Sequence, residues 1–199
     1  MLFHSLTALL AFSVAQQTTA GQPPADLAVF VGRFVDIREL PNVCEGKDCI
    51  SLDARYGATY EVLKTLRGSI SNKTISFEVF DHYGLPDFTR YEISLLFVEQ
   101  SKDGNYLQKY HGFAVDPTID GSWGYCGPFS FGKVKVEIKD LQDIDFVPGV
   151  VFGAVGSLNN RAIREQYNPS IYEVKNGLVY CRKGLKAEKL VALFLGARE

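Results

Sequence analysis

The sequence predicts a mainly β fold in which five antiparallel strands form a barrel, followed by a β-hairpin and a carboxy-terminal helix. Apolar and polar residues alternate with a period of two over most of residues 27–110. Short turn-forming connections, rather than helical crossovers, separate the alternating segments, and this favours antiparallel pairing. Five twisted strands of such length are expected to curl into a barrel.

The expected barrel strands follow one another along the chain. The first is rich in β-branched and aromatic residues, and its Gly32 marks an expected bulge or bend. The second and third are expected to form a hairpin, and the fourth and fifth face each other across a Gly-containing turn. The five strands are expected at residues 27–37, 58–66, 74–80, 91–98 and 106–110.

The pattern changes after residue 128. Residues 133–138 alternate again, whereas residues 141–167 are mixed, with a weakly helical stretch at residues 160–166. We divide the chain into a leader, a barrel domain and a carboxy-terminal extension, at residues 1–20, 21–139 and 140–199.

The extension contains the strongest hairpin signal of the chain. Asn176 and Gly177 both tolerate positive φ, and they separate two apolar-rich segments at residues 171–175 and 178–182. Apolar residues then recur at helical spacing through residues 185–197. We expect an amphipathic helix there, which packs on the barrel or seals one of its ends.

The leader indicates export. Residues 6–15 form an uncharged apolar run that is too short to span a bilayer and is typical of a secretory signal peptide, with cleavage after Ala15 or Ala20. Residues 1–4 contain no Lys or Arg, so a flexible or buried amino-terminal segment is the alternative. Export predicts a secreted or periplasmic protein, and no second apolar run reaches membrane-spanning length.

Composition and charge limit the classes of molecule that the protein is expected to bind. Hydrophobic residues make up 46% and charged residues 22% of the chain, as in ordinary globular proteins. The formal net charge is -2 and there is no long basic run. Nucleic acids and anionic membranes require a concentrated cationic surface, so the sequence argues against both as partners.

The cysteines are expected to form disulfides, because an even number in an exported chain favours them. We expect Cys44 to pair with Cys49, and Cys126 with Cys181, which would tie the extension to the main body. Closing the longer loop should stabilise the fold by about 4 kcal/mol. A zinc site is the alternative, but no histidine stands near any of these cysteines.

Several segments carry a family resemblance, at residues 29–33, 60–68, 91–98 and 120–123 with Cys126. In their order and spacing over residues 27–139, they resemble the netrin-module and tissue inhibitor of metalloproteinases (TIMP) superfamily. The resemblance implies an OB-like five-stranded antiparallel barrel with accessory helices, and a non-catalytic role in protein binding.

One departure from this family bears on function. Inhibitors of the family chelate the zinc of their target with an amino-terminal cysteine in a Cys-x-Cys start. The expected mature termini, Gln16 and Gly21, are not cysteines, and the first cysteine is Cys44. The chelating mechanism is therefore not carried over. We expect an exported binding module for a protein or small ligand, without cofactor, metal or catalytic residues.

Two segments are candidates for the binding surface. Tyr83, Leu85 and Phe88 lie in the loop at residues 81–89, and loops that join strands of an OB barrel are its customary binding surface. Trp123 and Tyr125 lie in a Gly-rich segment. The alternative for the second pair is a buried plug over the barrel end.

Two other functions stay open. His82 and His111 are the histidines beyond the leader, and a secreted hydrolase or metal-dependent enzyme using His82 and its neighbours is one alternative. No nucleophile elbow or paired-histidine metal motif accompanies them. A structural envelope protein is the other alternative.

Asn72 begins a sequence that satisfies the N-glycosylation rule, and it lies in an expected turn.

Overall fold

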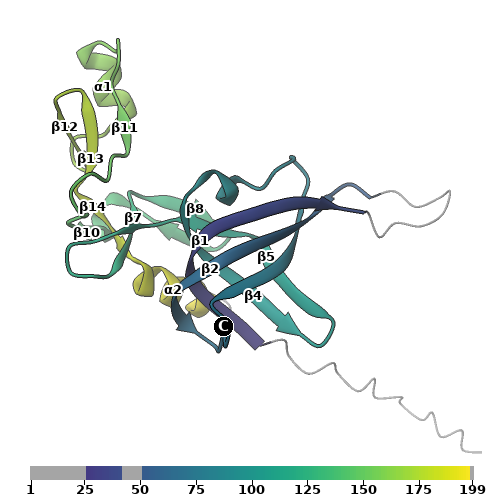
Figure 1. Ribbon diagram of the computed structural model, residues 1–199. Helices are drawn as coiled ribbons and strands as arrows, with labels where there is room; N and C mark the ends of the chain where they lie inside the picture. Colours follow the sequence, from purple (N-terminus) through teal and green to yellow (C-terminus); the bar gives the residue numbers. More distant parts are fainter. Residues whose placement is uncertain (1–25, 42–50, 198–199) are drawn as a thin grey trace, which may run out of the picture.

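A computed structural model describes residues 26–41 and 51–197 and confirms a mainly β protein with a five-stranded sheet (Figure 1). The expected leader and the Cys44–Cys49 pair lie outside the described residues. The five long strands are β1 (Asp26–Leu40), β2 (Ala54–Arg67), β3 (Thr74–Asp81), β4 (Ile93–Ser101) and β5 (Gly104–Ala114).

The long strands are ordered β1-β2-β3-β5-β4, and β4 pairs again with β1, which closes the ring. Pairing is antiparallel everywhere except between β3 and β5, which run parallel and share a single residue pair, Glu78 with Tyr106. This β3–β5 junction departs from the expected all-antiparallel pairing. With one shared pair, it is the least extensively hydrogen-bonded junction of the barrel.

β1 and β4 are buried on both faces. Phe30 and Leu96 belong to the core inside the barrel, whereas Val29 and Phe97 belong to a second core on its outer face. The helix α2 (Ala187–Gly196) covers that outer face, and the rings of Phe97 and Phe194 lie 5.5 Å apart. Side chains alternate across a strand, so burial of both faces explains the unbroken apolar runs of β1 and β4.

The expected bend at Gly32 is present as a shift in register between Val31 and Gly32 where β1 pairs with β2. A side chain at Gly32 would lie 2.8 Å from the ring of Phe30. The carboxy-terminal helix, predicted at residues 185–197, is also present, and it packs against the barrel wall.

Beyond β5 the chain forms shorter elements. The strands β6 (Asp116–Pro117), β7 (Trp123–Cys126), β10 (Gln142–Asp143) and β14 (Lys183–Lys186) build a sheet ordered β10-β14-β7-β6. β8 (Phe129–Phe131) pairs with β9 (Val134–Val136), and two short 3-10 helices are η1 (Asp87–Arg90) and η2 (Ile138–Asp140).

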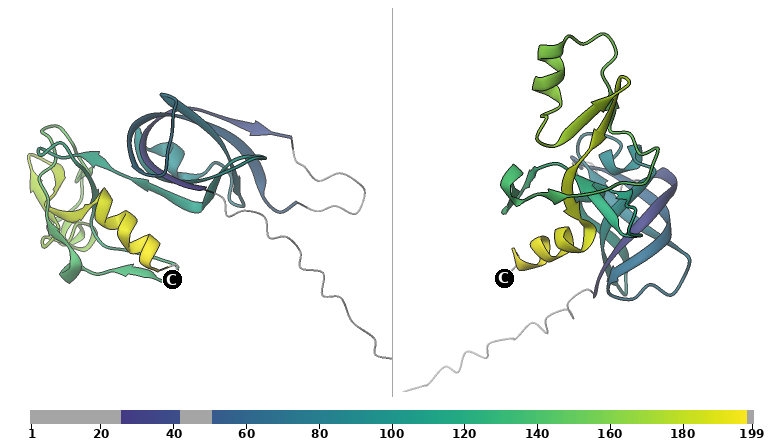
Figure 2. Two further views of the ribbon diagram at one scale, coloured as in Figure 1. Left: turned by 90° about the horizontal axis from the view of Figure 1, so that it is seen from below. Right: turned by 90° about the vertical axis from the view of Figure 1, so that its left-hand side faces the viewer.

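A small appendage, residues 153–181, projects away from the barrel (Figures 1 and 2). It contains β11 (Gly153–Ala154), α1 (Asn160–Gln166), β12 (Tyr172–Lys175) and β13 (Leu178–Cys181). The expected hairpin joins β12 to β13, and both Asn176 and Gly177 have positive φ. The Asn159 side chain accepts hydrogen bonds from two backbone N–H groups at the start of α1 and so caps it.

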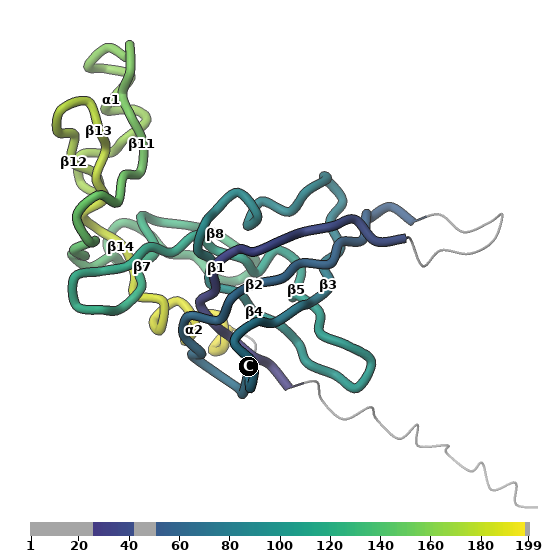
Figure 3. The backbone as a smooth tube through the Cα atoms, in the orientation of Figure 1, coloured from purple at the N-terminus to yellow at the C-terminus, as the bar shows by residue number. Residues whose placement is uncertain are grey.

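The chain leaves the barrel, traces the appendage and returns through β14 to α2 (Figure 3). The expected disulfide between Cys126 and Cys181 is present and joins β7 to the base of the appendage. Part of the extension, through β14 and α2, is therefore packed against the barrel domain. Among the described residues, no helix has both the length and the apolar character needed to cross a membrane.

Candidate functional site

A cleft lies beside the junction of β3 and β5 and is lined by residues from both strands. In the pairing of β4 with β5, Leu96 faces Gly112 and Val98 faces Leu107, so residues 108–111 bulge opposite Phe97. The bulge includes Tyr110, whose φ of 63° is uncommon for a residue with a side chain. The cleft, of about 340 Å³, is lined by Leu107 at its base.

Three apolar side chains at this opening form what we call the seam surface, namely Tyr83, Leu85 and Tyr110. They are 86%, 59% and 43% exposed, respectively. Tyr83 and Leu85 come from the β3–η1 connection, and Tyr110 comes from the bulge of β5. The cleft therefore brings together side chains that lie far apart in the sequence.

Phe88, the third residue expected on this surface, is a core residue with 3% exposure. It lies in η1, and its ring centroid is 6.0 Å from that of Tyr60 inside the barrel. A side chain at Gly112 would put its Cβ 2.7 Å from the Cβ of Phe88, so β5 needs a glycine there for η1 to approach. Phe88 anchors the loop and is not available for direct contact.

The loop is also held by a buried carboxylate. The Tyr83 backbone N–H donates a hydrogen bond of 2.8 Å to Oδ1 of Asp81, which is buried at the end of β3. The rings of His82 and Tyr83 meet edge to face at 5.2 Å. This hydrogen bond to Asp81 holds the backbone at Tyr83 in place, while the side chains of Tyr83 and Leu85 are exposed to solvent.

Charged groups border the seam surface. Lys109 Nζ lies 2.5 Å from Oδ2 of Asp53, and this hydrogen bond raises the pKa of Lys109. The same ammonium lies 5.4 Å from the ring centroid of Tyr110. The ion pair ties the bulge of β5 to the residue that precedes β2, which limits how far Tyr110 can move.

His82 belongs to the same charged border. Its Nδ1 donates to the Leu52 carbonyl oxygen at 2.7 Å and lies 3.6 Å from Oδ1 of Asp53. The described residues contain no group of three or more His, Cys, Asp or Glu side chains able to hold a metal ion. His111 has different surroundings, because its ring packs against Phe131 and Phe194 at 4.7 and 5.2 Å.

Trp123 and Tyr125, the second expected patch, lie on β7 and are half-buried. Both pack against the outer core, and the ring of Tyr125 lies 5.3 Å from that of Phe129. They do not line the cleft of the seam surface. The structure therefore separates the two expected patches, and Tyr125 lines a different cleft.

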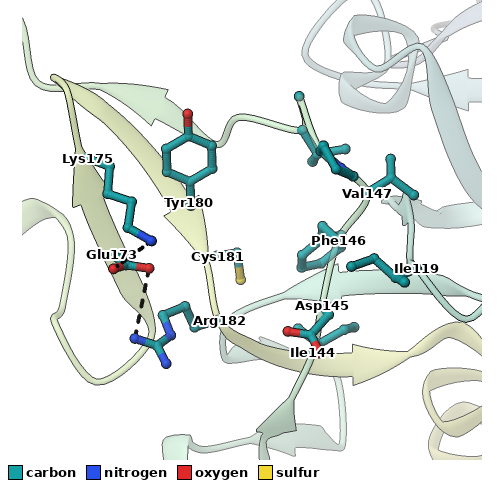
Figure 4. A pocket seen from close by; sticks show the side chains of 13 residues that line it. Ile119, Ile144, Asp145, Phe146, Val147, Glu173, Lys175, Tyr180, Cys181 and Arg182 are labelled. Carbon is teal, nitrogen blue, oxygen red and sulfur yellow. Dashed lines mark ion pairs between the residues drawn. The ribbon is translucent and has the colours of Figure 1, made fainter.

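A third hollow, of about 550 Å³, lies between the β12–β13 hairpin and residues 144–150 (Figure 4). Its apolar lining includes Phe146 and Val147. On the hairpin side, Glu173 pairs with Lys175 at 3.0 Å and with Arg182 at 3.9 Å. Glu173 thus pairs with both cations of the hairpin side, and Asp145 adds a second carboxylate to the lining of the hollow.

Sequence reasoning missed Tyr110 as a surface residue. The signal was a loss of alternation at residues 108–112, where Gln-Lys-Tyr-His-Gly replaces the regular pattern of a strand. No family model matches the chain, and comparisons with curated proteins and with solved structures likewise give no match.

Proposed function

We propose that the protein is an exported, non-catalytic binding module with an OB-like barrel of the TIMP/netrin type, which contacts a protein partner through the seam surface. The observation that carries this proposal is the gathering of Tyr83, Leu85 and Tyr110 around one cleft, with the Tyr83 backbone hydrogen-bonded to the buried Asp81. Exposed apolar side chains that cluster, rather than scatter singly, mark interaction sites.

The strand order supports the OB-like part of the proposal. An OB fold is a five-stranded Greek-key barrel whose loops and outer strand faces bind ligands. Here β5 lies between β3 and β4, and the ring closes between β4 and β1. Export, by contrast, rests on the sequence of residues 1–20 alone.

The composition of the seam surface supports a protein as partner. Tyrosine is enriched among residues that contribute most to binding energy, because it buries a large area and keeps a polar end. The cleft beside Tyr83 has a volume of about 340 Å³, enough for one apolar side chain of a partner to enter. The paired charges of Asp53 and Lys109 would lie at the rim of such a contact.

An enzyme that uses His82 has less support. A histidine oriented by a carboxylate can act as a general base, and Asp53 lies near His82. However, Asp53 is also the partner of Lys109, and the Leu52 carbonyl already engages His82 Nδ1. A structural role, in which His82 anchors the loop to the residues before β2, accounts for these contacts.

The proposal is tested by affinity capture from the fluid into which the protein is exported. The bait is the full mature chain, compared with a Tyr83→Ser, Leu85→Ser double variant and with an Ile119→Ser control. Ile119 is 67% exposed and lies outside the seam surface, so the control removes a similar apolar group elsewhere. We expect the double variant to bind the captured partner at least about tenfold more weakly than the wild type does.

The control should bind that partner as the wild type does. A partner that binds equally well to the wild type and to the double variant, both folded by circular dichroism, would contradict the seam surface as the contact region. Loss of binding in the Ile119→Ser control alone would place the contact on the turn between β6 and β7 instead.

A further inference from the structure

A larger cleft, of about 900 Å³, lies between the barrel and the appendage. Its lining includes Tyr91 and Asp116 on the barrel side, Tyr125 on β7, and Tyr172 on β12 of the appendage. Its volume falls within the range of small-molecule sites, which are usually apolar and have a few polar groups. The cleft contains none of the three side chains of the seam surface, although its lining shares Arg90, Tyr91 and Gly112 with the smaller cleft beside them.

Asp116 is the unbalanced charge in this cleft. Its carboxylate is half-buried and, within residues 26–41 and 51–197, has no hydrogen bond or ion pair. Burial, and then the nearby carboxylate of Glu92, raise the pKa of Asp116. Leaving a partly desolvated carboxylate without a partner is costly, and a bound cation would remove that cost.

The two arginines of the cleft already have partners. Arg33 Nη1 lies 2.9 Å from Oε2 of Glu61, and its Nε lies 3.5 Å from Oε1 of Glu92. Arg90 Nε lies 3.6 Å from Oδ1 of Asp87. An anionic ligand would have to compete with those carboxylates and would also meet the charge of Asp116. The electrostatic arrangement therefore favours a cationic ligand over an anionic one.

Three phenol groups surround the same space. The side chains of Tyr91, Tyr125 and Tyr172 all line the cleft, and burial, followed by the neighbouring Tyr172 and Tyr91, raises the pKa of Tyr125. Aromatic faces attract organic cations, and phenol oxygens accept hydrogen bonds from ammonium groups. Phe152 adds apolar surface to the wall of the cleft.

We propose that this cleft binds a small molecule carrying an organic ammonium group on an apolar body, with Asp116 as its counter-charge and the rings of Tyr91, Tyr125 and Tyr172 as its walls. This site goes beyond the proposed protein-binding function and does not depend on it. A neutral apolar ligand would cover Asp116 without pairing it, which is why the ammonium group is part of the proposal.

The probe is phenethylammonium, which combines an aryl body with a primary ammonium group. Its neutral and anionic counterparts are 2-phenylethanol and 3-phenylpropionate, and a lysine side chain is represented by Nα-acetyl-lysine methylamide. Each is titrated into the oxidised mature chain while amide chemical shifts are followed by NMR. We expect phenethylammonium to bind at least about tenfold more tightly than 2-phenylethanol, with shifts at Asp116, Tyr125 and Tyr172.

Matched variants test whether the charge of Asp116, and not only the shape of the cleft, is responsible for phenethylammonium binding. Asp116→Asn keeps the shape of the side chain and should weaken phenethylammonium binding by about tenfold or more. Asp143→Asn removes an exposed carboxylate outside the cleft and should leave binding unchanged. Tyr172→Phe removes one hydroxyl group and provides a second test if Asp116→Asn does not fold. It should weaken binding by a few-fold, because the ring remains.

Several results would overturn the inference. These are no binding of phenethylammonium at millimolar concentration, equal binding of 2-phenylethanol, tighter binding of 3-phenylpropionate, or unchanged affinity in Asp116→Asn. Tighter binding of the lysine analogue than of phenethylammonium would assign the cleft to a partner's lysine and overturn the small-molecule inference. None of these results bears on the seam surface, because its variants, at Tyr83 and Leu85, lie outside the larger cleft.

Discussion

Asp120 forms the most connected polar cluster on the turn between β6 and β7. Its Oδ1 accepts hydrogen bonds from the hydroxyl groups of Thr118 and Ser122, both at 2.6 Å, and its Oδ2 pairs with Lys186 at the start of α2. The ammonium of Lys186, followed by these hydroxyl groups, holds the pKa of Asp120 well below its usual range. A single exposed carboxylate therefore links this turn to α2.

We expect the contribution of Asp120 to stability to depend on pH. A carboxyl group whose pKa is lowered by folding stabilises the folded state above its unfolded pKa, and this stabilisation is lost as the pH falls toward the folded value. Asp120→Asn should therefore lower the urea midpoint at neutral pH, and its effect should shrink progressively below about pH 4. Urea titrations of both proteins across this pH range provide the measurement.

Asp36→Asn is the control for this prediction, because Asp36 is an exposed acid on β1. It should change the midpoint little at any pH. An Asp120→Asn effect of constant size between neutral and acidic pH would mean that the charge of Asp120 does not contribute, and that only the shape of its hydrogen-bonded turn does.

At the scale of elements, α2 is held by four buried side chains, Ala187, Leu190, Val191 and Phe194, of which Phe194 is the largest. Phe194 is 4% exposed, and its ring lies 5.0 Å from Phe113 of β5 as well as 5.5 Å from Phe97 of β4. The helix has only ten residues, too few to be stable alone in water, so its formation relies on this packing.

Phe194→Ala should lower the free energy of unfolding by about 3–5 kcal/mol, because it leaves a cavity between the helix and the barrel. Lys189→Ala is the matched control on the exposed face of α2, and we expect it to be nearly neutral. Denaturant titrations followed by circular dichroism give both values. A loss below about 1 kcal/mol for Phe194→Ala would show that α2 contributes little to the stability of the barrel.

Local sequence patterns predicted the elements better than their pairing. The five long strands, the hairpin at Asn176-Gly177 and the terminal helix follow from periodicity and turn residues close to each segment. The parallel junction of β3 with β5 was not predictable in this way, because it depends on which strands meet after the barrel closes. The short strand β14, which follows the hairpin directly, was also missed.

In the candidate site, too, local sequence patterns predicted some features, whereas contacts between distant parts of the chain were not predicted. Tyr83 and Leu85 were predicted as binding residues because their loop joins two strands of the expected OB-like barrel, and both are exposed. Phe88 lies in the same loop but turns into the barrel, where Gly112 leaves room for it. The contribution of a glycine on a distant strand to the burial of Phe88 cannot be read from the loop's own sequence.

For the whole molecule, the Cys126–Cys181 disulfide is a covalent cross-link between the base of the appendage and the sheet beside the barrel. It closes a loop with a sequence separation of 55 residues, which contains the whole appendage. In the chain-entropy model, a loop of this length stabilises the folded state by about 4 kcal/mol. The disulfide also lies beside the proposed ammonium cleft, because Cys126 is part of its lining.

Replacing both cysteines with alanine should therefore act mainly on the appendage. We expect faster amide hydrogen exchange in β12 and β13 of the Cys126→Ala, Cys181→Ala variant, while the paired strands β1 and β4 keep most of their protection. The barrel strands should keep their protection from amide exchange, because the inner core around Phe30 and Leu96 does not include the disulfide. Phenethylammonium binding should weaken in the same variant, because Tyr172 lines the cleft from β12 of the appendage, which the disulfide holds in place. Equal loss of protection in the barrel and the appendage would instead show that the two unfold as one cooperative unit, and that the disulfide stabilises the whole chain.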